Sequence, residues 1–187
     1  LQNKGILFTM IMFFLIQVCV MLLQPLITMY VGQLMGQVND EAVQMAGVIF
    51  SLAGISGILA APFWGKRGQR YGYVKTFCYI TFGAGVVNLL QFFTTDVYQF
   101  AVVQFIYGLF LAGAIPNINA NLAEVTDKSI RGKAFGLVTS AQMSGGFVGP
   151  LLGGALGYFL PTKLVIISTG IILISVAGYT YLKKVKA

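Results

Sequence analysis

Six long apolar runs constrain the fold of this chain more than any other feature of its sequence. Each run is long enough to cross a bilayer as a helix, which takes about 20 residues. They lie near residues 6–31, 42–64, 74–94, 98–123, 133–158 and 163–182. Only 9 % of the residues are charged, against roughly 25 % in a soluble domain. We therefore expect an all-α membrane protein, with residues 1–187 forming one domain of six transmembrane helices.

The basic residues gather at one end of these spans. Eleven of the twelve Lys and Arg residues fall on one side, namely Lys4, Lys66, Arg67, Arg70, Lys75, Lys128, Arg131, Lys133, Lys183, Lys184 and Lys186. The other side holds only Lys163, together with Asp40, Glu41 and Asp96. Because cytoplasmic loops carry the excess of Lys and Arg, we expect a multi-pass protein of the plasma membrane with both termini in the cytoplasm. The net charge of +7 then reports topology and gives no reason to expect a nucleic-acid partner.

The first span carries a polar face. Gln17, Met21 and Gln24 are spaced three and four residues apart, so they share one side of a helix. Lipid cannot satisfy a side-chain amide, so the glutamines should face protein or water. One interpretation is the wall of a substrate cavity, in which methionine adds adaptable apolar contact. The alternative is hydrogen bonding between packed helices.

The fourth span has a second polar face and a break. Pro116 lacks the backbone N–H that would bond to the carbonyl of Ala112, so the helix should kink there. Asn117 and Asn121 share a face that Glu124 continues toward the cytoplasmic end. This polar, kinked segment predicts either a cavity lining or a proline kink satisfied by neighbouring amides.

Glycines dominate the fifth span. Gly145, Gly149, Gly153 and Gly157 recur every four residues, with Pro150 among them. Such a side-chain-free stripe lets another helix approach closely. It is equally compatible with fixed packing and with a surface on which helices move.

Enzymatic chemistry is not expected. The sequence contains no histidine and no visible nucleophile–base pair, metal cluster or phosphate-binding loop. Cys19 and Cys78 lie inside apolar runs and are predicted to be small core residues. We expect neither a cofactor nor a metal.

Two motifs resemble the major facilitator superfamily. Its loop signature between the second and third spans, G-x-x-x-D-R-x-G-R-K, is matched at Gly65, Arg70 and Gly72, with Gln69 in place of Asp and Tyr73 in place of a basic residue. The fifth span is similar to the G-x8-G-x3-G-P-x2-G-G signature of the drug:proton antiporters. It matches at every defined position, namely Gly136, Gly145, Gly149, Pro150, Gly153 and Gly154.

This resemblance implies half of a twelve-span transporter that exports drug-like molecules in exchange for protons by alternating access. The missing Asp of the loop, Gln104 where the family's first half often has Arg, and Leu1 as first residue favour the C-terminal half. The expected partners are the other six-span half, the bilayer and a hydrophobic or amphipathic substrate. The substrate would contact Gln17, Met21, Gln24, Asn117 and Asn121, and the Gly-Pro stripe would be a hinge or sliding face between the halves.

Two other functions remain open. The same fold also suits a uniporter or symporter of a sugar or another metabolite, because fold does not determine substrate. A non-transporting membrane scaffold is the alternative from another class, although the polar faces argue against it.

The positions of the carboxylates bear on which half of the transporter should carry the coupling proton. All five, Asp40, Glu41, Asp96, Glu124 and Asp127, lie in loops or near span ends. Proton relays usually use ionisable groups at membrane depth. We therefore predict that this half does not carry the coupling proton.

Overall fold

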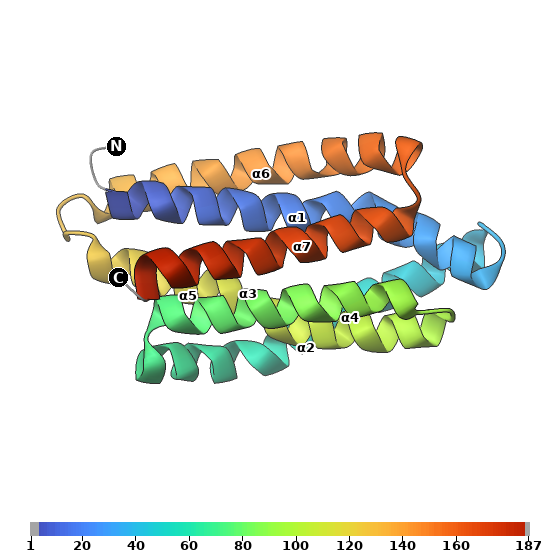
Figure 1. The fold of residues 1–187 in the computed structure, drawn as a ribbon, viewed down its shortest axis with the longest axis horizontal. Coiled ribbons are helices and arrows are strands. Elements are labelled where there is room, and N and C mark those ends of the chain that lie inside the picture. Colours follow the sequence, from blue (N-terminus) through green and yellow to red (C-terminus); the bar gives the residue numbers. More distant parts are fainter. Residues whose placement is uncertain (1–3, 186–187) are drawn as a thin grey trace.

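A computed structural model of the chain describes residues 4–185, which form an antiparallel helical bundle (Figure 1). Its helices are α1 Lys4–Met35, α2 Asp40–Tyr71, α3 Tyr73–Leu90, α4 Val97–Leu111, α5 Ala114–Val125, α6 Arg131–Phe159 and α7 Thr162–Thr180. A short 3-10 helix, η1 (Gln91–Phe93), follows α3, and a π-helical turn, η2 (Tyr181–Val185), follows α7. The first turn of α1 and the end of α7 lie at the same end of the bundle. The all-α class predicted from the sequence is confirmed.

Five segments of the described chain are long and apolar enough to cross a membrane, namely residues 5–35, 40–71, 73–93, 97–125 and 162–183. The fourth of them combines α4 and α5. The sixth expected span corresponds to α6, which has 29 residues and extends beside α1 along most of the bundle. Its glycines and polar residues lower its mean hydropathy, so α6 has the length of a span without the composition of one.

The turn after α2 is shorter than expected. The sequence predicted a loop between the spans near 42–64 and 74–94, but α2 remains helical through Gly65, Gln69 and Arg70 as far as Tyr71. Only Gly72 forms the turn, with a φ of 92° that disfavours residues with a side chain. The loop prediction was wrong because isolated glycines in a membrane helix do not end it when neighbouring helices support the backbone.

The break in the fourth span is present where Pro116 predicted one. α4 ends at Leu111, and α5 begins at Ala114, so Pro116 occupies the first turn of a helix, where its missing N–H costs nothing. The N–H of Gly113 bonds to the carbonyl of Phe110, at 3.2 Å, and so leaves the carbonyl of Leu109 without its usual helical donor. Trp64 Nε1 of α2 donates to that carbonyl instead, at 2.7 Å.

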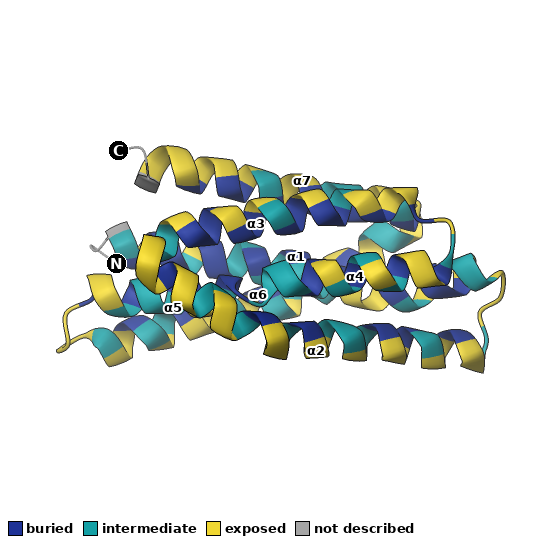
Figure 2. Cartoon of the chain, turned by 90° about the horizontal axis from the view of Figure 1, so that it is seen from below, coloured by how far each residue is buried: buried dark blue, intermediate teal, exposed yellow. Residues whose placement is uncertain are grey.

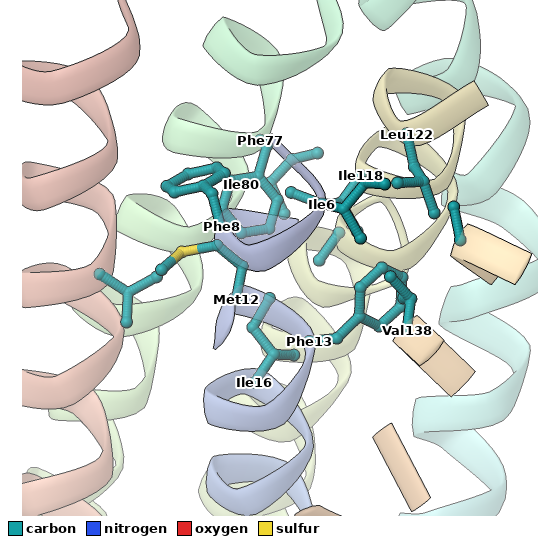
Figure 3. Close-up of a cluster of buried hydrophobic side chains, with 13 residues drawn as sticks. Ile6, Phe8, Met12, Phe13, Ile16, Phe77, Ile80, Ile118, Leu122 and Val138 are labelled. Carbon is teal, nitrogen blue, oxygen red and sulfur yellow. The ribbon is translucent and has the colours of Figure 1, made fainter. Parts of the chain in front are cut away.

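Each helix buries one face and leaves another exposed (Figure 2). α1 packs most extensively against α6, and α3 against α7. One core cluster joins α1, α3, α5 and α6 through residues such as Phe13, Phe77, Ile118 and Val138 (Figure 3). Large apolar side chains such as Ile58 and Phe147 are exposed, as expected of a surface that meets lipid or another membrane helix.

Candidate functional site

A cavity of about 480 Å³ lies among α1, α2, α4, α5 and α6. The middle and second half of α1 form one wall, and Phe50, Ala53 and Gly57 of α2 form another. Ala112 and Ile115 border the cavity at the break between α4 and α5. The cavity therefore lies beside the interrupted fourth span, at the point where the regular backbone hydrogen bonding of α4 ends.

α1 contributes the polar face that its sequence predicted. Gln17, Met21 and Gln24 all line the cavity. Gln142 Nε2 of α6 lies 3.4 Å from Gln17 Oε1, within hydrogen-bonding distance. The two interpretations of the glutamines therefore coexist, since Gln17 both lines the cavity and bonds to another helix.

α4 contributes two polar residues that sequence reasoning did not place in the cavity. Gln104 lines it, and its Oε1 accepts a hydrogen bond of 2.8 Å from Gln91 Nε2. Tyr107, one turn further along, is 5 % exposed, and its hydroxyl has no partner among the described residues. The spacing of Gln104, Tyr107, Gly108 and Leu111 on one helical face was the available signal.

The predicted asparagines of α5 lie outside the cavity in this conformation. Asn117 is 1 % exposed, and its Nδ2 donates to the carbonyls of Gly113 at 2.8 Å and Trp64 at 3.3 Å. Asn121 is half-buried one turn further on. Asn117 thus ties α5 to α2 through backbone carbonyls at the break, as in the alternative in which neighbouring amides satisfy the proline kink.

The glycine stripe of α6 packs against α1. A Cβ atom at Gly145 would lie 2.7 Å from the Phe14 carbonyl oxygen, and one at Gly149 would lie 2.7 Å from Met21 Cβ. A Cβ atom at Gly153 would lie closer still to the carbonyl oxygen of Leu22. We expected this stripe to face the second half of a transporter; its partner is instead α1 of the same unit.

The other members of the two motifs have different surroundings. Gly136 and Gly154 are exposed, with open space where a Cβ would lie, and Pro150 is half-buried within α6. In the loop motif, Gln69 and Arg70 are exposed on the last turns of α2. The buried glycine there is Gly68, which no motif position includes; its Cα faces Asn117 Oδ1 too closely to leave room for a side chain.

The cavity is lined by uncharged groups only. Its polar residues are Gln17, Gln24, Gln104, Tyr107 and Gln142. The five carboxylates lie elsewhere, at helix ends or in loops, and the described residues hold no cluster of three potential metal ligands among His, Cys, Asp and Glu. Such a site suits reversible binding of a ligand through amide dipoles and apolar contact.

Comparison with known proteins places this geometry in a family. The profile described as Major Facilitator Superfamily matches residues 6–186. The multidrug resistance protein MdtG of Yersinia enterocolitica is 33 % identical over 136 residues, and that of Escherichia coli K12 is 32 % identical over the same length. These matches cover 72 % of this chain but 32 % and 33 % of the relatives, so the chain spans about a third of their length. The chain belongs to the Major Facilitator Superfamily, whose members are multi-pass membrane transporters and not enzymes.

Proposed function

We propose that this chain is the C-terminal half of a secondary transporter that exports small hydrophobic or amphipathic molecules by alternating access, in exchange for protons. The observation that carries the proposal is the cavity beside the break in the fourth span, with apolar walls and uncharged polar groups. An amphipathic cargo would gain apolar contact from Met21 and Phe50 and hydrogen bonds from the glutamines. The printed name of the relatives, multidrug resistance protein, supports the same class of cargo.

The polar groups of the cavity suit a variety of cargoes. An amide offers both a donor and an acceptor, so four glutamines can rearrange around molecules of different shape. The buried hydroxyl of Tyr107 is available to bond to a cargo, because no described residue bonds to it. Leaving such a group unsatisfied costs free energy, and a bound cargo would remove that cost.

The distribution of charge supports one orientation in the membrane. The basic ends of α2 and α3 and the start of α6 lie together with the end of α7. Under the positive-inside rule this end would face the cytoplasm, and we propose that both termini lie on that side. In that orientation the break in the fourth span sits on the cytoplasmic side of the cavity. A shift of α5 there would alter access from the cytoplasm.

Two departures from the family motifs support the assignment to the second half. Gln69 replaces the Asp of the loop motif, and Gln104 stands where the first half often has Arg.

The exposed Gly154 leaves a flat surface on α6 next to the buried stripe. That surface is our candidate for contact with the other half.

A second candidate function is uptake or exchange of a sugar or another uncharged metabolite. The four cavity glutamines favour it, because sugars are recognised largely through hydrogen bonds. Counterflow in vesicles with and without an imposed pH gradient separates the two functions, since only the antiporter responds to the gradient.

Labelling of single cysteines tests the cavity directly. In the intact protein, Gln17→Cys, Met21→Cys and Gln24→Cys should react with a water-soluble maleimide, and excess cargo should slow the reaction. Native Cys19, which is 2 % exposed on the same helix, serves as the internal control and should stay unlabelled in peptide mass spectra. Inertness of all three positions would show that this face does not line an aqueous pathway.

A further inference from the structure

A second cavity, of about 550 Å³, lies as a groove between α1 and α7. Its α1 wall consists of Leu7, Phe8, Ile11, Met12 and Leu15. These residues lie on nearly the opposite side of α1 from Gln17, Met21 and Gln24, because helical neighbours recur at three and four residues. The groove therefore faces away from the cargo cavity, toward the outside of the bundle.

The floor of the groove separates it from the interior of the bundle. Met12 is 2 % exposed, and Thr180 Oγ1 of α7 lies 3.4 Å from its sulfur. Figure 3 shows Phe8 and Met12 on the same side of α1 as part of this packed cluster. Leu7 and Ile11 on the rim are 42 % and 46 % exposed, so the groove has a closed floor and an open side.

One cation, Lys183, is among the described residues that line this apolar groove. Lys183 lines it at the basic end of the bundle, one turn beyond Tyr179. Lys183 Nζ donates to the Tyr179 hydroxyl at 2.7 Å and lies 5.2 Å from the centre of that ring. An ammonium group has three donors, so Lys183 can bind an anion and Tyr179 together.

We propose that this groove is a binding site for one anionic phospholipid of the leaflet at the basic end of the bundle. An acyl chain would lie along Leu7, Ile11 and Ile172, and the phosphate would bond to Lys183 Nζ. Three features select this occupant: hydrocarbon walls, an opening toward the outside, and a cation at the end where headgroups lie. Basic pockets between membrane helices on the cytoplasmic side are suited to anionic headgroups.

Native mass spectrometry of the purified intact protein tests the proposal with phosphatidylglycerol and phosphatidylcholine of the same acyl chains. Lys183→Gln should weaken phosphatidylglycerol binding by about fivefold, as expected for one cation at a membrane surface, and should leave phosphatidylcholine binding unchanged. Lys128→Gln removes the same charge from the loop between α5 and α6 and should change neither.

A matched pair on α7 tests the hydrocarbon part of the site. Ile172 lines the groove and adjacent Ile171 does not. Ile172→Trp should therefore reduce binding of both lipids, whereas Ile171→Trp should not. If Ile172→Trp does not fold, the lysine pair still decides the question.

Three results would overturn the proposal. Equal binding of the two lipids by the wild type would exclude an anionic site. Equal loss in Lys183→Gln and Lys128→Gln would indicate general surface electrostatics. Unchanged lipid binding in Ile172→Trp, combined with lost binding of a hydrophobic dye, would make the groove a path for cargo.

Discussion

Gly149 illustrates how much of this structure depends on the absence of a single side chain. Its Cα lies against α1 at a point where a Cβ would come within 3.0 Å of the Val18 carbonyl oxygen and 2.7 Å of Met21 Cβ. The four-residue spacing predicted such a contact. Glycines four residues apart share one face of a helix, and a face without side chains lets another helix approach closely. The partner was not predictable, since spacing carries no information about which helix fills the gap. Met21 itself lines the cavity among α1, α2, α4, α5 and α6, so the glycine stripe also positions a cavity residue.

The substitution Gly149→Leu should separate α1 from α6. Overpacking of a tight contact typically costs about 1–3 kcal/mol, and here the blocking atoms include backbone that cannot move aside easily. We expect a lower yield of folded protein and a lower thermal unfolding temperature in detergent. Gly136→Leu, an exposed position on the same helix with open space where a side chain would lie, is the control and should change both values little. Equal stability of the two variants would contradict a role of the stripe in packing.

At the scale of elements, the interrupted fourth span is held by groups from α2. Trp64 supplies the donor for the freed carbonyl of Leu109, and the Trp64 carbonyl accepts from Asn117. The break was predictable from Pro116, because proline has one clear effect on a helix. The hydrogen bonds that compensate for it were not predictable, since they depend on how α2 and α4 pack. For the same reason Asn117 looked like a cavity residue, although it serves this junction.

The substitution Trp64→Phe should loosen the junction between α2, α4 and α5. The Leu109 carbonyl would lose its donor in a partly buried position, at a cost of about 1–3 kcal/mol. We expect a lower unfolding temperature by circular dichroism and faster hydrogen exchange in residues 109–117. Phe63→Leu alters an aromatic residue at the adjacent position, which is 54 % exposed, and should have the smaller effect. Unaltered exchange in Trp64→Phe would mean that another group satisfies the carbonyl.

At the scale of the whole molecule, charged residues lie at the ends of the bundle, and the polar groups that line its cavity are uncharged. The order of the expected spans was predictable from the sequence, because a bilayer imposes length and apolarity on every span. The number of helices was not, because the fourth span consists of two helices, α4 and α5. The far wall of the cavity, which includes Gln104 and Tyr107, was not predictable, because hydropathy does not indicate which face of α4 turns toward α1. None of the five carboxylates is among the residues that line the cavity.

Neutralising each carboxylate should therefore leave proton coupling intact. The five variants are Asp40→Asn, Glu41→Gln, Asp96→Asn, Glu124→Gln and Asp127→Asn. We expect every variant to retain efflux driven by an imposed pH gradient in proteoliposomes of the intact protein. Asp96→Asn should keep its helix cap, because asparagine also accepts from the Tyr98 N–H. If Glu124→Gln abolishes gradient-driven efflux while substrate exchange continues, the coupling group lies on this half.

The low hydropathy of α6 has a consequence for how the protein is made. A helix rich in glycine gains little from partitioning into hydrocarbon, since glycine offers almost no apolar surface to transfer. Its favourable environment is the face of α1, which the ribosome synthesises first. We therefore expect α6 to enter the bilayer stably only after α1 is in place. Membrane insertion would then depend on α1 and α6, the same helix pair that contributes to the cavity. A defect in α1 would make α6 the span that the cell's quality control is most able to recognise as misfolded.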